Sequence, residues 1–135
     1  KSKNYRKMET QMEIEVRAWD ISKKKFHYPK LWDNTMPSNW EQHYEINLYT
    51  RLKDVNKKHI YVGDLLKGHD GFIYRVWFVR GGFAINVHVD KFKHDIKMDY
   101  PFPLQCLSDE QTVSYIENNC EVIGNIYENP ELLQP

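Results

Sequence analysis

The residue types best suited to metal binding or proton transfer gather near His88. His88 and Asp90 lie two positions apart in an alternating segment, so both side chains face the same side of a strand, and His94 follows shortly after. An imidazole beside a carboxylate can bind a metal ion or pass a proton, which would suit a metal-dependent hydrolase. The alternation, however, places His88 and Asp90 on the polar face, and two ligands without a third make a weak site. We therefore expect structural or solvent-facing roles here, with no metal and no cofactor.

Motifs of nucleophilic and phosphate-transfer enzymes are missing from the sequence. It contains no Gly-X-Ser-X-Gly segment, which presents the serine of many hydrolases. Gly81-Gly82 lacks the Gly-Lys-Ser/Thr ending of a phosphate loop and lies between two strand-like segments. The neighbouring acids Asp109 and Glu110 are explained by a helix N-terminus. We predict that the protein is not an enzyme and has no catalytic residues.

Aromatic and basic residues are mixed in the segment 74–93, and five of them form our candidate binding surface: Arg75, Trp77, Arg80, Lys91 and Lys93. Aromatic rings with Lys and Arg suit a single-stranded nucleic acid. The same residue types are equally favoured where proteins bind proteins. On a strand, Arg75 and Trp77 face one way while Tyr74 and Phe78 face the other, so half of these aromatics belong to the core. Core aromatics with ordinary surface charges are the remaining interpretation.

The composition is that of one globular domain, with 135 residues of which 41% are hydrophobic and 14% aromatic. The net charge is zero but unevenly distributed: residues 1–30 carry nine Lys and Arg against four acids, whereas residues 106–135 carry six acids and neither Lys nor Arg. A basic arm for nucleic acid is one interpretation. A solvated basic segment is the other, and the acids interleaved in it favour that interpretation.

The two cysteines, Cys106 and Cys120, have no second thiol or paired histidine nearby. This excludes a cysteine-rich zinc module and disfavours a disulfide framework, so we expect reduced, partly buried thiols in a cytoplasm. No apolar run approaches the roughly 20 residues that span a bilayer. The N-terminal residues lack the apolar region of a secretory signal. We expect a soluble protein without a membrane partner.

The elements begin with an N-terminal hairpin. Residues 1–11 lack periodicity and are expected to form an extension, native or introduced with the expressed sequence. Alternation over 13–19 predicts a half-buried strand, and 25–28 is the return strand. Two prolines within 29–42 predict a long irregular loop.

Short strands then follow one another closely, over 44–50, 60–66, 72–80 and 83–90. The turns between the last three contain glycines, at Gly68 to Gly71 and at Gly81-Gly82. Short strands joined by tight glycine turns favour a small barrel. We place its core at about 44–105.

One helix is predicted over about 109–119. Ser108 and Gln111 have the spacing of a capping box, with Ser108 as N-cap. Asn118-Asn119 would end the helix in a left-handed conformation. A closing strand follows over about 121–127, and Asn129 caps a terminal turn that starts at Pro130.

Three segments resemble a known family in sequence and in order: Arg17-Ala18-Trp19-Asp20, Ile60-Tyr61-Val62-Gly63-Asp64, and Cys120 to Leu133, which reads Cys-Glu-Val-Ile-Gly-Asn-Ile-Tyr-Glu-Asn-Pro-Glu-Leu-Leu. The chain from Met12 onward is similar to the YopX-like proteins of phages and prophages. Arg51 and Lys57 stand where such proteins usually have glycine. The resemblance implies an SH3-like β-barrel core and a gene carried by a phage or prophage. It implies no activity and no site residues.

The sequence therefore predicts a mainly β domain over 12–135: an SH3-like small β-barrel with an N-terminal hairpin and one C-terminal helix plus a closing strand. We expect a non-enzymatic accessory protein in the cytoplasm of the bacterial host. Its partner would be a host or phage protein, or a second copy of itself, bound through an apolar patch that includes Trp32 or Trp40. The alternative is a nucleic-acid-binding barrel that uses the basic N-terminal region with Lys91 and Lys93.

Overall fold

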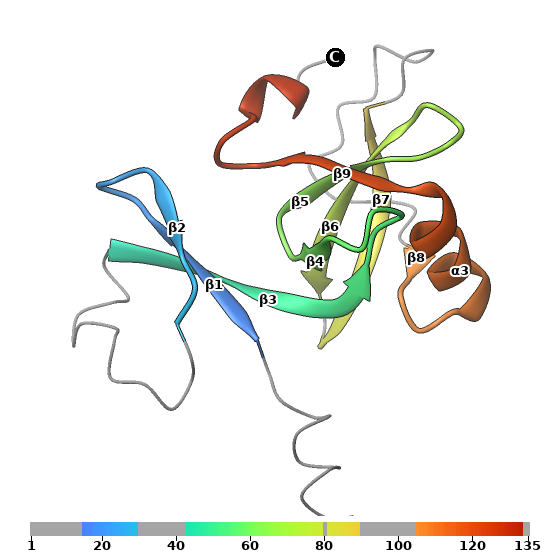
Figure 1. Cartoon of the computed structure of the whole chain (residues 1–135), viewed down its shortest axis with the longest axis horizontal. Helices are drawn as coiled ribbons and strands as arrows, with labels where there is room; N and C mark the ends of the chain where they lie inside the picture. The colour runs from blue at the N-terminus through green and yellow to red at the C-terminus, as the bar shows by residue number, and fades with distance from the viewer. Residues whose placement is uncertain (1–14, 30–42, 80, 90–104, 134–135) are drawn as a thin grey trace, which may run out of the picture. The chain divides into compact units, whose positions relative to one another are not determined.

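The computed structural model describes residues 15–29, 43–79, 81–89 and 105–133, and it shows antiparallel strands with one α-helix (Figure 1). Predictions for the extension at 1–11, for most of the loop at 29–42 and for Trp32 and Trp40 lie outside these residues. The chain divides into two compact units, 1–48 and 49–135. Strand β3 (Tyr44–Lys53) runs through the boundary, and each unit is described by itself.

The first unit is built on the predicted N-terminal hairpin, β1 (Val16–Asp20) and β2 (Lys25–His27), with β1 also pairing antiparallel to β3. All five residues of β1 are buried, so the prediction of a half-buried strand was wrong. The polar face is covered because Arg17 packs its guanidinium carbon 4.3 Å from the ring centroid of Phe26. Its Nε also donates to Asn47 Oδ1 at 3.0 Å.

The second unit contains the C-terminal half of β3 paired with a short strand, and a five-stranded sheet in the order β8-β7-β6-β5-β9. A helix and a final 3₁₀ turn complete it. The bounds are β4 His59–Tyr61, β5 Asp64–Lys67, β6 Ile73–Val79, β7 Gly82–Val89, β8 Gln105–Cys106, α3 Glu110–Asn119, β9 Glu121–Asn125 and η1 Pro130–Leu133.

One face of the five-stranded sheet forms the main core. Neighbouring strands contribute side chains that the antiparallel register places side by side, and α3 and β4 contribute the rest; the buried set is Ile60, Leu66, Tyr74, Val76, Ile85, Ile116, Cys120 and Val122. On the opposite face, Leu65 is also fully buried. The 3₁₀ turn η1 packs against β7. The sheet therefore buries residues on both faces.

Helix α3 begins one residue after its predicted start and ends at Asn119 as predicted, but the predicted caps at its two ends were wrong. Asp109 is the N-cap and makes no side-chain capping bond. Ser108 does not cap because its hydroxyl lies 3.0 Å from the Cys106 thiol. At the other end no left-handed residue occurs, because Cys120 is already extended and leads directly into β9.

The turn between β6 and β7 was predicted one residue too late. Gly82 already pairs with Val79 as part of β7, and Gly81, with a φ of +79°, precedes the strand. A positive φ is easily adopted by glycine, which suits Gly81 to the turn. Each residue of β6 therefore pairs with a β7 residue two positions earlier than predicted. Because a shift of two residues keeps every side chain on its predicted face of the sheet, only the cross-strand partners change.

The closing segment is held by asparagine side chains. Oδ1 of Asn125 accepts from the backbone N–H groups of Tyr127 and Glu128 at 3.0 and 2.8 Å, which ends β9 at Asn125 and not at the predicted 127. The terminal turn starts at Pro130 as predicted, and the backbone oxygen of Asn129 accepts from Leu132 N–H at 3.0 Å, but the Asn129 side chain does not bond to this turn. Its Oδ1 instead accepts from the backbone N–H of Asn125 at 3.2 Å.

The mainly β prediction is confirmed, with the N-terminal hairpin, the single described helix and the closing strand. The SH3-like description of the barrel remains a prediction. Among the described residues, no helix combines the length and hydropathy needed to cross a membrane.

Candidate binding site

Two of the predicted surface residues, Arg75 and Trp77, lie together on β6. They alternate with the core residues Tyr74 and Val76 and so occupy the face of the sheet opposite the main core. The Arg75 guanidinium carbon lies 3.7 Å from the centroid of the Trp77 ring system, and both side chains are partly exposed. A cation over an indole ring is attracted by the electrons of its face. The pair therefore forms a preorganised aromatic and cationic surface.

The indole of Trp77 is fixed by the neighbouring strand. Its Nε1 donates to Oδ1 of Asn86 at 2.6 Å, and Asn86 is almost fully buried. The register of β6 and β7 places Asn86 directly opposite Arg75. Because the asparagine cannot move without losing its packing, it sets the orientation of the ring on which Arg75 lies.

The guanidinium of Arg75 is partly removed from water without a matching acid. Burial lowers the pKa of Arg75, and the nearby Tyr127 acts weakly in the opposite direction. An arginine nevertheless stays protonated in proteins. Its Nε is buried and has no hydrogen-bond partner among the described residues. A partly desolvated cation with an unused donor favours an anionic group supplied from outside.

The other predicted site residues are not brought into this surface by the described structure. Arg80, Lys91 and Lys93 lie outside the described residues. Phe78 was assigned to the core with Tyr74, but its side chain is 44% exposed and packs edge-on against Phe83, with 5.2 Å between ring centroids. The cause is its position at the end of β6, next to the turn, where the core no longer covers the sheet.

The structure does not test the hypothesis of a metal-dependent hydrolase, because the side chains of His88, Asp90 and His94 lie outside the part described. In that described part, no three histidine, cysteine, aspartate or glutamate side chains come together as a metal site would need.

A second polar cluster involves Asp70, Tyr74 and Tyr115. The Tyr74 hydroxyl donates a short hydrogen bond to Asp70 Oδ2. Burial pushes the pKa of Asp70 up, but the Tyr74 hydroxyl and the Phe72 N–H outweigh it and leave that pKa below its usual value. Burial, and then Asp70, raise the pKa of Tyr74 far above its ordinary value. The pKa values of Asp70 and Tyr74 are both shifted further from pH 7. General acid–base catalysis needs a pKa close to the working pH, so these shifts oppose such a role.

The motif segments serve the architecture. Asp20 Oδ1 accepts from the N–H groups of Ser22 and Lys23 at 3.0 and 2.9 Å and closes the β1–β2 turn. Asp64 Oδ2 accepts from Tyr61 N–H at 2.8 Å and closes the turn between β4 and β5. The resemblance implied no site residues, and the described contacts give these aspartates structural work.

Sequence reasoning missed Asn86. Its polar character within an alternating strand was visible, but the turn predicted at Gly81-Gly82 would have placed His88 opposite Arg75. Only the observed register, in which Val79 pairs with Gly82, brings Asn86 to that position. Gly-Gly is itself a favoured pair for a two-residue hairpin loop, so no local signal in the sequence marked the observed register.

Comparisons with known proteins agree with this fold. The family model described as YopX protein matches residues 2–134. None of the curated proteins matches the sequence. Among solved structures, the crystal structure of protein EF1440 from Enterococcus faecalis is similar, with a TM-score of 0.57 and 26% sequence identity. That match covers 90% of this chain and 98% of the other.

Proposed function

The chain belongs to the YopX protein family, and from this premise we propose that it is a non-enzymatic accessory protein that binds a partner protein through Arg75 and Trp77. The observation that carries the proposal is the Arg75 guanidinium, held 3.7 Å from the Trp77 ring with an unused Nε donor. Trp and Arg dominate the binding energy of many protein interfaces because they combine large contact area with directed hydrogen bonds. The partner's contact group is an acidic side chain or a carboxyl terminus.

The non-enzymatic part of the proposal is supported by the use of polar residues. Polar side chains in the motif segments close turns, and the shifted pKa values of Asp70 and Tyr74 lie away from neutrality. We further propose that the protein is encoded by a phage or prophage and acts in the cytoplasm of the host. The sequence resemblance to YopX-like proteins supports this. A second copy of the chain is a candidate partner, since residues at such interfaces are of the same types.

The test compares the proteins retained from a bacterial lysate by the wild type and by two variants. Arg75→Met removes the charge while keeping much of the stem, and Lys67→Met removes one exposed charge at the end of β5 as the matched control. We expect a partner that is retained by the wild type and by Lys67→Met but lost with Arg75→Met. Binding of the purified partner should weaken about 10- to 100-fold for Arg75→Met. Equal retention by all three proteins would contradict the proposal, as would a catalytic turnover by the purified protein.

Nucleic-acid binding is the second candidate function, and a different observation favours it. Basic side chains gather on the hairpin of β3 and β4, on strands other than those that carry Arg75 and Trp77.

A further inference from the structure

Four basic side chains lie within eight residues on the β3–β4 hairpin: Arg51, Lys53, Lys57 and Lys58, all of them exposed. The turn is fixed by backbone hydrogen bonds from Asp54 N–H to Lys58 oxygen at 2.8 Å and from Lys57 N–H to Asp54 oxygen at 2.9 Å. Lys53 and His59 are directly paired across the hairpin. We call these four side chains the basic hairpin.

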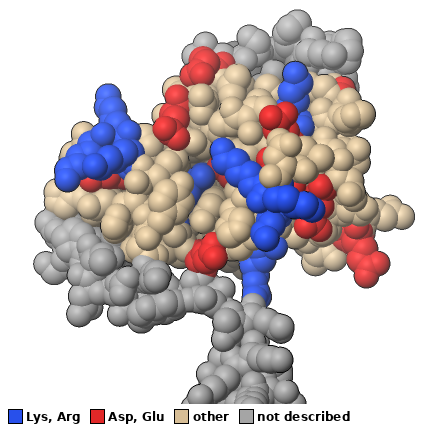
Figure 2. Space-filling model, viewed as in Figure 1, with Lys and Arg blue, Asp and Glu red and all other residues tan. Residues whose placement is uncertain are grey.

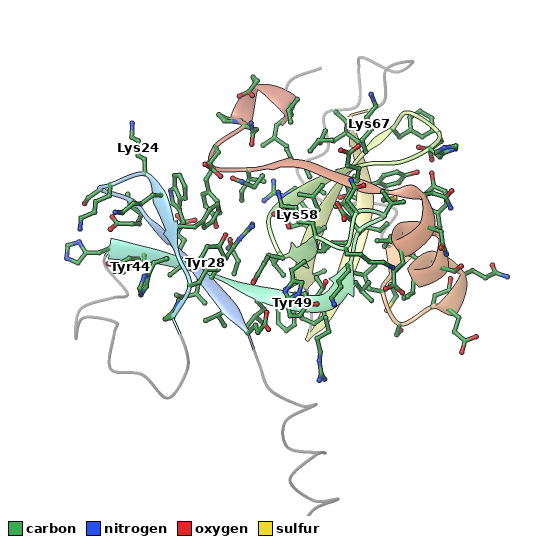
Figure 3. The ribbon with its side chains drawn as sticks, viewed as in Figure 1. Lys24, Tyr28, Tyr44, Tyr49, Lys58 and Lys67 are labelled. Atoms are coloured by element: carbon green, nitrogen blue, oxygen red, sulfur yellow. The ribbon has the colours of Figure 1, made fainter. Side chains whose placement is uncertain are left out.

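The basic hairpin is not neutralised by the fold. None of its four side chains forms an ion pair or a hydrogen bond with any residue that the structure describes. In the space-filling view, Lys and Arg gather across the middle of the second unit (Figure 2), where the end of β3 and β4 lie in Figure 1. Figure 3 labels Tyr49 on β3 and Lys58 within the second unit. Like charges held this close repel one another, so the arrangement is unfavourable for the isolated protein.

Two of these residues also have backbone conformations that disfavour them. Arg51 has a φ of +70° and Lys57 a φ of +67°, in the left-handed region that glycine adopts without strain. A side chain in this region is strained because its Cβ crowds the backbone. Lys24 is the other described non-glycine residue with a positive φ, at +54°.

No hydrogen bond or ion pair within the described fold compensates for the backbone strain at Arg51 and Lys57. Glycine would keep the turn and relieve the strain, yet both positions carry exposed cations that pair with none of the residues the structure describes. A residue that costs stability, and whose side chain makes no hydrogen bond or ion pair with the described residues, is explained by something that binds to it. Because both strained residues are cations, we infer that the bound molecule requires positive charge at these two positions.

Aromatic rings lie beside the charges. The rings of Tyr49 and His59 are stacked, with 4.4 Å between centroids and an angle of 10° between planes, and both are partly exposed. His59 pairs directly with Lys53, which places the rings and the charge on one face of the hairpin. A short row of cations beside stacked rings matches a sugar–phosphate backbone with its bases. Aromatic residues are also favoured at protein interfaces, so an acidic protein is the competing ligand that the test below has to exclude.

We propose that the basic hairpin is a nucleic-acid-binding surface, in which Arg51, Lys53, Lys57 and Lys58 contact backbone phosphates. Contact with the phosphate backbone positions a nucleic acid without reading its sequence. This proposal rests on the second candidate function named above and gives it its contact residues. It uses other strands than the Arg75–Trp77 site, so its failure leaves the proposal for that site standing.

The test measures binding of the full chain to fluorescent, mixed-sequence single- and double-stranded DNA of about 20 nucleotides, at about 50 and 200 mM salt. The wild type should bind with an affinity that falls steeply with salt. In Arg51→Gly and Lys57→Gly, each lost phosphate contact should weaken binding roughly fivefold at about 0.1 M salt and reduce the salt slope by about 0.7 to 0.9. The same variants should keep the wild-type Tm or raise it by about 1–3 °C, because the strain is relieved.

Two further variants separate charge from strain. Lys57→Gln removes the charge but keeps a side chain at positive φ, so it should weaken binding as much as Lys57→Gly without raising Tm. Lys24→Gly makes the same change of charge and backbone in the first unit, on the β1–β2 turn, and should leave the binding affinity within about twofold.

Each contrary outcome overturns the proposal. No salt-dependent binding to either DNA would remove the surface as a nucleic-acid site. Equal weakening by Lys24→Gly and Lys57→Gly would show a diffuse charge effect and no binding at the hairpin. Equal affinity for poly-glutamate of the same charge would assign the surface to acidic proteins instead. A large loss of Tm in Lys57→Gly would show that the lysine stabilises the fold, and would remove the argument from strain.

Discussion

The carboxylate of Asp54 holds the backbone amide of Val122, 68 residues further along the chain, with 2.9 Å between Oδ2 and nitrogen. Its Oδ1 accepts from the N–H groups of Asn56 and Lys58, both at 2.8 Å. Asp54 is 1% exposed. One carboxylate therefore shapes the turn of the basic hairpin and joins it to the start of β9, next to the main core.

We expect Asp54→Ala to lower the free energy of unfolding by about 3–5 kcal/mol, because a buried Val122 N–H loses its acceptor and the turn loses two charge-assisted bonds. Urea denaturation followed by tryptophan fluorescence measures this. Asp54→Asn keeps one oxygen acceptor, so its free energy of unfolding should lie between those of the wild type and Asp54→Ala. The neighbouring exposed acid, changed in Glu121→Ala, should shift stability by less than about 0.5 kcal/mol. If Asp54→Ala lowered the free energy of unfolding by less than about 1 kcal/mol, water would have to replace the carboxylate as the hydrogen-bond acceptor.

The second prediction concerns Gly124, which lies against Asn129. A Cβ at Gly124 would come within 2.6 Å of Asn129 Cγ, so Gly124→Ala must displace the side chain whose Oδ1 accepts from Asn125 N–H. We expect a loss of about 1–3 kcal/mol. Asn129→Ala makes room, so adding Gly124→Ala to it should cost clearly less than in the wild type. A double-mutant cycle measures this coupling; additive effects would show that the contact does not set the cost.

Local pattern in the sequence was enough to predict the element types, because alternation and glycine turns depend on neighbours along the chain. Arg75 and Trp77 were placed on one face for the same reason. Asp54 shows what the local pattern misses, because its hydrogen bond to Val122 exists only in the tertiary fold. The buried Arg17 reversed the expected half-buried strand because Asn47, 30 residues away, satisfies it.

The basic hairpin was missed for a related reason. Arg51 and Lys57 stood out as departures from the glycines that the resemblance led us to expect, and this put the turn geometry in question. The structure keeps positive φ at both positions, so the backbone is unchanged and only the chemistry differs. A sequence shows which residue occupies a turn, but the strain that the residue tolerates depends on its φ.

The two cysteines should differ sharply in reactivity. Cys106 is exposed, and hydrogen bonds from Ser108 lower the pKa of its thiol. Burial raises the pKa of the Cys120 thiol to about 12. Since the thiolate is the reactive form, a maleimide at neutral pH should label Cys106 in the native protein and Cys120 only in urea. Cys106→Ser should abolish native labelling and Cys120→Ser should not. Rapid native labelling of Cys120 would show that the start of β9 opens readily.

The hydrogen bond between Tyr74 and Asp70 should make stability depend on pH. The pKa of Asp70 is lower in the folded protein than its ordinary value of 3.8, since the donated bonds outweigh burial. The folded state therefore gains stability above the unfolded pKa and loses it as the pH falls through the folded one. Asp70 is exposed, so solvent screening keeps the gain small.

Tyr74→Phe removes the donor, and we expect it to cost about 0.5–1 kcal/mol at pH 7, since a hydrogen bond to a charged acceptor in contact with water is partly replaced by solvent. The difference from the wild type should shrink toward about pH 3, because the carboxylate becomes protonated in both proteins. Urea denaturation at about pH 7, 5 and 3 gives the three differences. In an Asp70→Asn background the same substitution should show no such pH dependence. A constant difference at all three pH values would mean that Tyr74 stabilises the core through its ring alone.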